Sequence, residues 1–148
     1  MQIRIHVPSQ TLDLLDGNSL LRRYVISTSR FGLGSEPGSH KTPLGRFRVA
    51  EKVGAGAAPG EIFVSRVAQG RSGKESDEHD HVQTRILWLE GLEEGNANTF
   101  ERYIYIHGTN AESQLGKPAS MGCVRMSNSD VIDLFDRIEV DAAVEIQT

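Results

Sequence analysis

The stretch YIYIHGTNAESQLGKPASMGCVRMSNSDVIDLF, residues 103–135, decides the fold because it joins a strand, a loop and a helix in one segment. Its first residues are β-branched and aromatic, which is typical of a strand that ends at His107 and Gly108. Cys123, the only cysteine of the chain, follows 123 − 107 = 16 residues later. A strand-end histidine and a cysteine preceded by Gly122 therefore mark this segment as the place to look for chemistry.

The end of the same segment predicts a helix. Ser127 is followed three residues later by Asp130, an arrangement that resembles a capping box. Apolar residues then recur at helical spacing and form one stripe: Val131, Leu134, Phe135 and Ile138.

The rest of the chain predicts mainly strands. Alternating or β-branched sequence marks the segments 2–7, 11–16, 20–28, 46–53, 61–67, 84–92, 102–107 and 142–148, with an Asp16-Gly17 hairpin turn. Residues 29–45 are rich in Gly, Ser and Pro and predict a long functional loop. Residues 68–83 are polar and charged, and we expect them to be exposed and mobile. The fold class is therefore mainly β, in one domain over residues 1–148, with one clear helix.

Composition narrows the class of protein. Of the 148 residues, 38% are hydrophobic and 24% are charged, as in a globular protein. The net charge of −4 argues against nucleic acid as a partner. No transmembrane segment of about 20 apolar residues occurs. The N-terminus lacks the apolar core of a signal peptide, so the sequence as given predicts a cytoplasmic protein, or one of the periplasm or cell envelope if a leader was removed.

Two interpretations of Cys123 are open. A lone cysteine is often a buried, inert core residue. However, a glycine before it allows close backbone approach, and a helix start downstream would offer N–H groups that stabilise a thiolate and an oxyanion. His107 has the same two interpretations, a structural histidine or a base facing a cleft, and spacing alone does not bring the two side chains into contact.

The motifs IHGTN (106–110) and SMGCVRM (120–126) resemble the active-site segment of the L,D-transpeptidase (YkuD-type) family. Upstream, VISTS (25–29) and KTPLGRFRV (41–49) resemble the family's strand-loop-strand with its TP-x-G-x-F element, and the resemblance covers most of residues 20–146. The family's fold is a compact β-barrel or sandwich with a helix beside the cysteine. That expectation agrees with the strands and the helix predicted above.

The resemblance assigns roles residue by residue. Cys123 matches the nucleophile, His107 matches the base, and the Gly108 carbonyl matches the group that orients the imidazole. Gly122 and Cys123 match the backbone oxyanion donors. The remaining matches are the motif serine, Ser120, and Arg125, for which a substrate carboxylate and a surface ion pair are equally open partners.

Other residues are weaker candidates. Met121 stands where relatives often have histidine or another polar residue, so it puts substrate preference in doubt rather than the chemistry. Trp88 is a candidate for the cleft wall, although aromatic residues in strands are more often core. The sequence DEHDH (77–81) lacks a second ligand cluster and predicts a solvated loop, so we expect neither a metal nor a cofactor.

The resemblance implies cysteine-dependent acyl transfer on peptidoglycan tetrapeptide stems or muropeptides. Cys123 would cleave the bond between the L-centre of diaminopimelate and D-Ala through a thioester. Water as acceptor gives an L,D-carboxypeptidase, and a stem amine gives a cross-linking L,D-transpeptidase. The resemblance also implies that carbapenems acylate the cysteine. The alternative is a degenerate module that binds peptidoglycan without catalysis.

Overall fold

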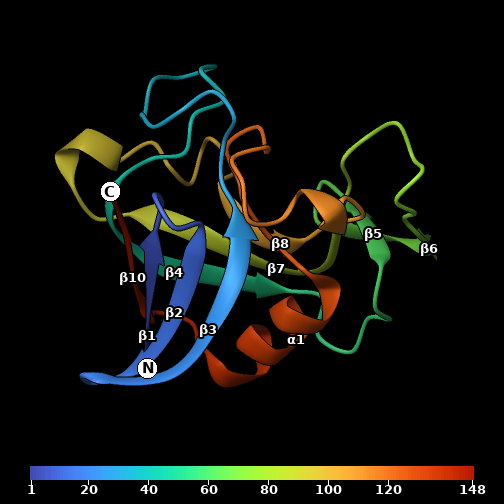
Figure 1. The fold of residues 1–148 in the computed structure, drawn as a ribbon, viewed down its shortest axis with the longest axis horizontal. Coiled ribbons are helices and arrows are strands. Elements are labelled where there is room, and N and C mark those ends of the chain that lie inside the picture. Colours follow the sequence, from blue (N-terminus) through green and yellow to red (C-terminus); the bar gives the residue numbers. More distant parts are fainter.

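A computed structural model describes residues 1–148, and Figure 1 shows its elements. The single α-helix, α1, is Asn128–Arg137, and two short 3-10 helices are η1 (Glu94–Asn96) and η2 (Glu112–Gln114). The ten strands are β1 (Gln2–His6), β2 (Thr11–Asp16), β3 (Ser19–Ser27), β4 (Gly45–Val53), β5 (Glu61–Val64), β6 (Val67–Ser72), β7 (Val82–Gly91), β8 (Tyr105–Gly108), β9 (Val124–Met126) and β10 (Ala143–Gln147). No helix is long and apolar enough to cross a membrane.

Eight of the strands form a closed ring. The order β4-β10-β1-β2-β3-β9-β8-β7 closes because β4 also pairs with β7, and the β5–β6 hairpin extends from β7. The pairs β1–β10 and β8–β9 are parallel and the other pairs are antiparallel. This mixed β-barrel confirms the predicted fold class, which was mainly β with one helix. Because the ring is closed, none of its eight strands presents an unpaired edge to solvent along its whole length.

The helix packs its apolar stripe against the barrel, beside β7 and β8 (Figure 1). Val131, Leu134, Phe135 and Ile138 belong to the main core cluster of 20 buried residues. The Ser127 hydroxyl accepts a hydrogen bond from the Asp130 N–H, which confirms the predicted start of the helix. The barrel core and α1 therefore form one apolar body beneath the loops.

Two predictions about strands were wrong. Residues 68–72, expected in a mobile loop, belong to β6 and pair with β5 in a hairpin whose side chains on β6 are all exposed. Polar composition concealed this strand because both of its faces lie outside the core. The short strand β9 was also missed, since three residues are too few to show periodicity. It pairs with β8 in parallel and sets His107 opposite Arg125.

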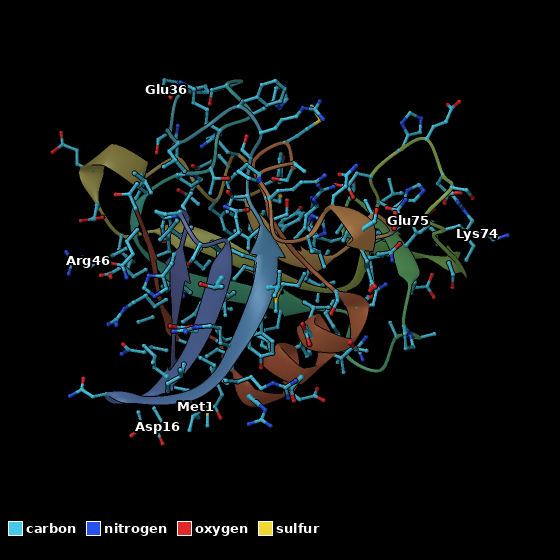
Figure 2. The ribbon with its side chains drawn as sticks, in the orientation of Figure 1. Met1, Asp16, Glu36, Arg46, Lys74 and Glu75 are labelled. Carbon is cyan, nitrogen blue, oxygen red and sulfur yellow. The ribbon has the colours of Figure 1, made fainter.

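Two long loops flank β8 and β9: one leaves the end of β3 near the start of β9, and the other enters β7 beside the end of β8. Residues 28–44 lie at the top in Figure 1, with Glu36 at the outer edge in Figure 2. Residues 73–81 follow β6, and Lys74 and Glu75 mark their start in Figure 2. These loops surround the segment that carries His107 and Cys123.

Candidate active site

His107 is held in one orientation near the end of β8. Its side chain is only 3% exposed, and its Nδ1–H donates a 2.6 Å hydrogen bond to the Gly108 carbonyl. A carbonyl can only accept, so the proton sits on Nδ1 and Nε2 keeps its lone pair. Burial lowers the pKa of His107 below its ordinary value, opposed by the Asp80 charge and the Gly108 carbonyl. The residue is therefore a neutral imidazole with a free basic nitrogen.

The Cys123 thiol is held less firmly and points elsewhere. Its Sγ–H donates to the Tyr103 carbonyl at 3.4 Å, and Sγ accepts from the Tyr105 N–H at 3.3 Å. No hydrogen bond joins it to His107. Burial raises the pKa of the thiol to about 11, and the Tyr105 N–H acts in the opposite direction. In this structure Cys123 is a protonated thiol turned towards the turn before β8.

The expected helix start near Cys123 is not there. The whole of β9 separates Cys123 from Ser127, the N-cap of α1, and the first helical residue, Asn128, lies beside Gly108 instead. The effect of a helix N-terminus falls off within its first turn. A thiol pKa lowered by this helix was therefore a wrong expectation.

Hydrogen bonds fix the loop that presents Cys123. The Ser120 hydroxyl donates to the Cys123 carbonyl at 2.6 Å and accepts from the Gly122 N–H at 3.3 Å. The Thr42 hydroxyl donates to the Gly122 carbonyl at 2.9 Å. Gly122 has φ +124, a backbone conformation that favours glycine. The Cys123 N–H makes no hydrogen bond, so it is free to donate to a developing oxyanion.

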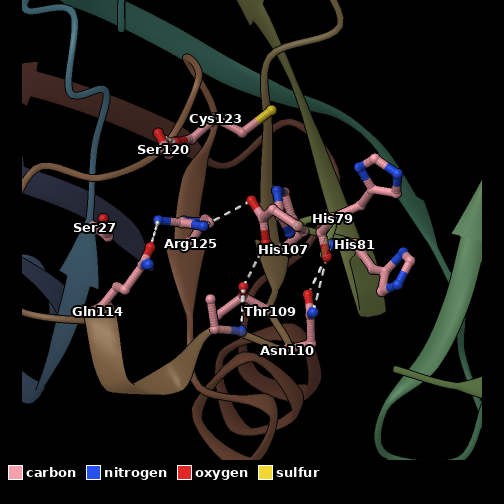
Figure 3. A network of polar contacts seen from close by, with 12 residues as sticks. Ser27, His79, His81, His107, Thr109, Asn110, Gln114, Ser120, Cys123 and Arg125 are labelled. Carbon is pink, nitrogen blue, oxygen red and sulfur yellow. Dashed lines mark hydrogen bonds and ion pairs between the residues drawn. The ribbon is translucent and has the colours of Figure 1, made fainter. Parts of the chain in front are cut away.

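Arg125 is neither exposed nor available. Its side chain is 2% exposed, its Nη1 lies 2.8 Å from the Asp80 carboxylate, and its Nη2 donates to the Gln114 side chain at 3.1 Å (Figure 3). The Thr109 hydroxyl also donates to Asp80 at 2.7 Å. Of the two partners expected for Arg125, the structure shows the ion pair, with Asp80, although the arginine itself is buried rather than on the surface.

The loop that carries Asp80 is attached to the site. The Asn110 side-chain amide donates to the carbonyls of Lys74 and His79 at 3.0 and 2.9 Å. His81 lies 3.1 Å from Asp77 within the loop. No group of three or more His, Cys, Asp or Glu side chains is arranged to hold a metal ion. No sequence pattern indicated that this acidic segment lies beside His107, because its contacts are with residues distant in the sequence.

Two cavities meet at Met121, which is 54% exposed. The first has a volume of about 330 Å³ and is lined by Pro37, Gly38, His40, Glu101, Arg102, Tyr103, Ile104, Met121 and Cys123. The second has a volume of about 320 Å³, and Arg30, Met121 and the acidic side chains of residues 75–80 are among its lining. The thiol therefore opens towards one cavity, and Met121 stands between that cavity and the acidic one.

Trp88 does not line either cavity. It is 7% exposed and belongs, with Phe63, Ile86 and Tyr105, to a second buried cluster against which Cys123 packs. Its Nε1–H donates to the Phe100 carbonyl at 3.1 Å. The ring is therefore a wall behind the thiol rather than an open cleft surface.

Arg102 is a residue of this site that the sequence did not indicate. It lines the thiol cavity and donates to the carbonyls of Gly34 and Lys41 at 3.3 and 2.7 Å. It thereby ties the loop 28–44 to the turn before β8. Chemically, the site combines a thiol, a neutral imidazole with a free Nε2 and a free backbone donor, which are the parts of a nucleophilic acyl-transfer centre.

Comparison with known proteins finds the family that the motifs resemble, over nearly the whole chain. The family model of the YkuD L,D-transpeptidase catalytic domain matches residues 1–146. YqjB of Bacillus subtilis is 51% identical over 41 residues, which are 28% of this chain and 23% of that protein. The match with this curated relative thus spans less than a quarter of its length.

Two solved structures share the fold. An L,D-transpeptidase from Xylanimonas cellulosilytica superposes with a TM-score of 0.64 at 20% identity, covering 98% of this chain and 59% of that one. L,D-transpeptidase 3 from Mycobacterium tuberculosis, solved in complex with a faropenem-derived adduct, gives 0.63 at 17% identity, covering 99% and 59%. At this identity the likeness concerns the fold alone.

Proposed function

Because the chain belongs to the L,D-transpeptidase (YkuD) catalytic-domain family, we propose that it transfers the acyl group of peptidoglycan stem peptides through a thioester on Cys123. One observation carries the proposal. The parallel pairing of β8 and β9 puts the segments of His107 and Cys123 side by side, with Nδ1 of His107 fixed by Gly108 so that Nε2 is free. The chain thus holds a nucleophile, a base and an orienting group in three separate residues.

The first half of the reaction forms the acyl-enzyme. The thiol leaves the Tyr103 carbonyl and turns towards His107, whose Nε2 takes the proton as Sγ attacks the carbonyl carbon of the diaminopimelate L-centre. The Cys123 N–H stabilises the oxyanion. His107 then returns the proton to the leaving nitrogen, the carbon–nitrogen bond breaks, and D-Ala departs from a thioester on Cys123.

The second half releases the acyl group to an acceptor. His107 removes a proton from water or from an amine, which attacks the thioester carbonyl, and the sulfur leaves as a thiol. Water gives a tripeptide, and the amine of a second stem gives a cross-link. Both routes use the same residues, and we propose hydrolysis as the main outcome when no amine is added.

Product analysis tests this function. Purified protein is incubated with disaccharide tetrapeptide alone and then with an excess of a D-amino acid. The muropeptides are separated by chromatography and identified by mass spectrometry. We expect tripeptide as the main product and only minor D-amino-acid exchange. Dimeric muropeptide as the dominant product would contradict the choice of water but keep the roles of Cys123 and His107.

One observation favours a second function, a peptidoglycan-binding module without catalysis. The thiol makes no contact with His107, and burial raises its pKa to about 11. If the protein binds tetrapeptide but releases no D-Ala and its thiol reacts no faster than free cysteine with a substrate-like acylating agent, the second function holds. Measurable turnover that requires Cys123 excludes it.

A further inference from the structure

The pairing of Arg125 with Asp80 removes the guanidinium that was expected to hold a substrate carboxylate. Arg102 is also engaged, because its guanidinium donates to two backbone carbonyls of the neighbouring loop. A third guanidinium on this side of the molecule, that of Arg66, has most of its N–H donors free. It forms no ion pair, and its one hydrogen bond is a 3.4 Å contact from Nη1 to the Tyr105 hydroxyl.

Aromatic rings hold Arg66 in place. Its guanidinium lies 4.8 Å from the centroid of the Trp88 ring and 5.4 Å from that of Tyr103. Phe100 stacks on Trp88 with 3.9 Å between centroids, so it covers one face of the indole and leaves the other to Arg66. Cation–π contacts fix a guanidinium without using its N–H donors. The side chain is therefore positioned while most of its donors remain free.

The backbone adopts an unfavourable conformation to place Arg66 there. Val64 pairs with Val67, so Ser65 and Arg66 form a two-residue hairpin turn, with φ of +48 and +64. Such turns strongly prefer Asn-Gly or Gly-Gly, because positive φ crowds the side chain of other residues. Ser-Arg nevertheless occupies this turn, and the conformation sets the guanidinium against the rings of Trp88 and Tyr103.

The same aromatic residues contact the thiol. The Tyr105 N–H donates to Cys123 Sγ while the Tyr105 hydroxyl accepts from Arg66. The Tyr103 carbonyl accepts the thiol proton while the Tyr103 ring lies under Arg66. Arg66 thus stands one tyrosine side chain away from the sulfur. Tyr103 and Tyr105 therefore each contact both the thiol and Arg66, on the same side of the sulfur as the second buried cluster.

We propose that Arg66 is a specificity-determining residue that binds the C-terminal carboxylate of the peptide whose bond Cys123 cleaves. This inference rests on the proposed function, since it assigns the leaving residue to the Arg66 side of the thiol. A guanidinium with free paired donors binds a carboxylate in two parallel hydrogen bonds. The protein then favours stems that end one residue beyond the scissile bond.

The test compares two substrates that differ only at that carboxylate. We measure kcat/KM for the disaccharide tetrapeptide with a free C-terminus and for its C-terminal amide. We expect wild type to favour the acid by about tenfold, the range of a charge-assisted hydrogen bond. Arg66→Gln should lose that preference and leave the amide rate within about twofold of wild type, and Arg66→Lys should keep part of it.

Arg30 supplies the matched control. Its guanidinium lies 4.9 Å over the Phe31 ring and forms no ion pair, but it lines the acidic cavity on the other side of Met121. Arg30→Gln should keep the full preference for the acid. Equal rates for acid and amide in wild type would overturn the proposal. So would an equal loss of both rates in Arg66→Gln, or a preference that disappears in Arg30→Gln instead.

A second measurement separates this inference from the proposed function. Calorimetric binding of the acid and the amide to Cys123→Ala needs no turnover. If wild type releases no D-Ala, the proposed function fails, yet tighter binding of the acid that disappears in Cys123→Ala/Arg66→Gln supports the Arg66 site. Equal binding of acid and amide to Cys123→Ala overturns the Arg66 site even if turnover is seen.

Discussion

His107 and Cys123 lie on neighbouring segments, but their side chains differ in burial and in how firmly hydrogen bonds hold them. The imidazole is almost completely buried and fixed by a 2.6 Å hydrogen bond to Gly108. The thiol is half-buried and makes only two long sulfur contacts, both to the Tyr103–Tyr105 turn. Under the proposed function, the thiol rather than the fixed histidine must therefore move for the two groups to act together.

The surroundings of the two groups differ in the same way. Beside His107, Asp80, Thr109 and Arg125 form a continuous set of hydrogen bonds and an ion pair. Behind Cys123 there are aromatic rings and a guanidinium with free donors. The polar side fixes the proton acceptor, while the aromatic side offers a surface on which a substrate can pack. The contrast indicates that the substrate completes the nucleophile side of the site.

Of the changes that test this comparison, removing the sulfur of Cys123 should have the largest effect on the rate of D-Ala release. Cys123→Ala should lower D-Ala release by at least about a thousandfold, since the nucleophile is lost. The folding free energy should change by about 1 kcal/mol, because the removed sulfur is only half-buried. Chromatographic D-Ala assays and thermal unfolding check both statements. Release within tenfold of wild type would move the site elsewhere.

Removing the base should have the next largest effect. His107→Gln keeps a polar side chain of similar size but no group that can accept a full proton near neutral pH. We expect kcat to fall by roughly 100- to 10,000-fold. His6→Gln, on β1 and outside the site, is the control and should leave kcat unchanged. A kcat for His107→Gln close to that of the control would mean that the fixed imidazole is structural.

The smallest expected effect concerns the negative charge of Asp80, which acts on both His107 and Cys123. Asp80 raises the pKa of the Cys123 thiol, so Asp80→Asn should lower that pKa and increase the thiolate fraction at a given pH. Iodoacetamide labelling of wild type should keep accelerating as the pH rises towards about 11, and Asp80→Asn should react about two- to threefold faster at pH 8. Asp136→Asn, exposed on α1, is the charge-matched control. Slower labelling of Asp80→Asn than of the control would reverse the assigned sign.

Sequence reasoning found the two sides of the site unequally. His107, Gly108, Ser120 and Cys123 lie in one continuous segment whose motif and strand pattern are visible, and the helix cap at Ser127 follows from local rules. Asp80 and Arg66 escaped because each reaches the site from a distant segment through a loop or hairpin, and Arg102 escaped because its contacts are with the distant loop 28–44. Their segments are polar or short, so no hydrophobic periodicity predicted where they would lie.

The fold shows the same division. Seven of the eight barrel strands were predictable because their sequence is alternating or β-branched, as in the alternating burial of β1. The β6 strand has no buried residue, and β9 has three residues that are all buried, so neither shows an alternating pattern. Ring closure through β4 and β7 is a tertiary pairing that local sequence does not encode.

The most direct test of Cys123 as the acylated nucleophile is intact-mass spectrometry of protein mixed with disaccharide tetrapeptide and quenched in acid within one turnover. Acid preserves a thioester, and the chain has no other cysteine. We predict a single adduct with the mass of the substrate less D-Ala, mapped to the peptide that contains Cys123 and absent from Cys123→Ala. Release of D-Ala with Cys123 unmodified throughout, or undiminished turnover by Cys123→Ser, would contradict the central claim.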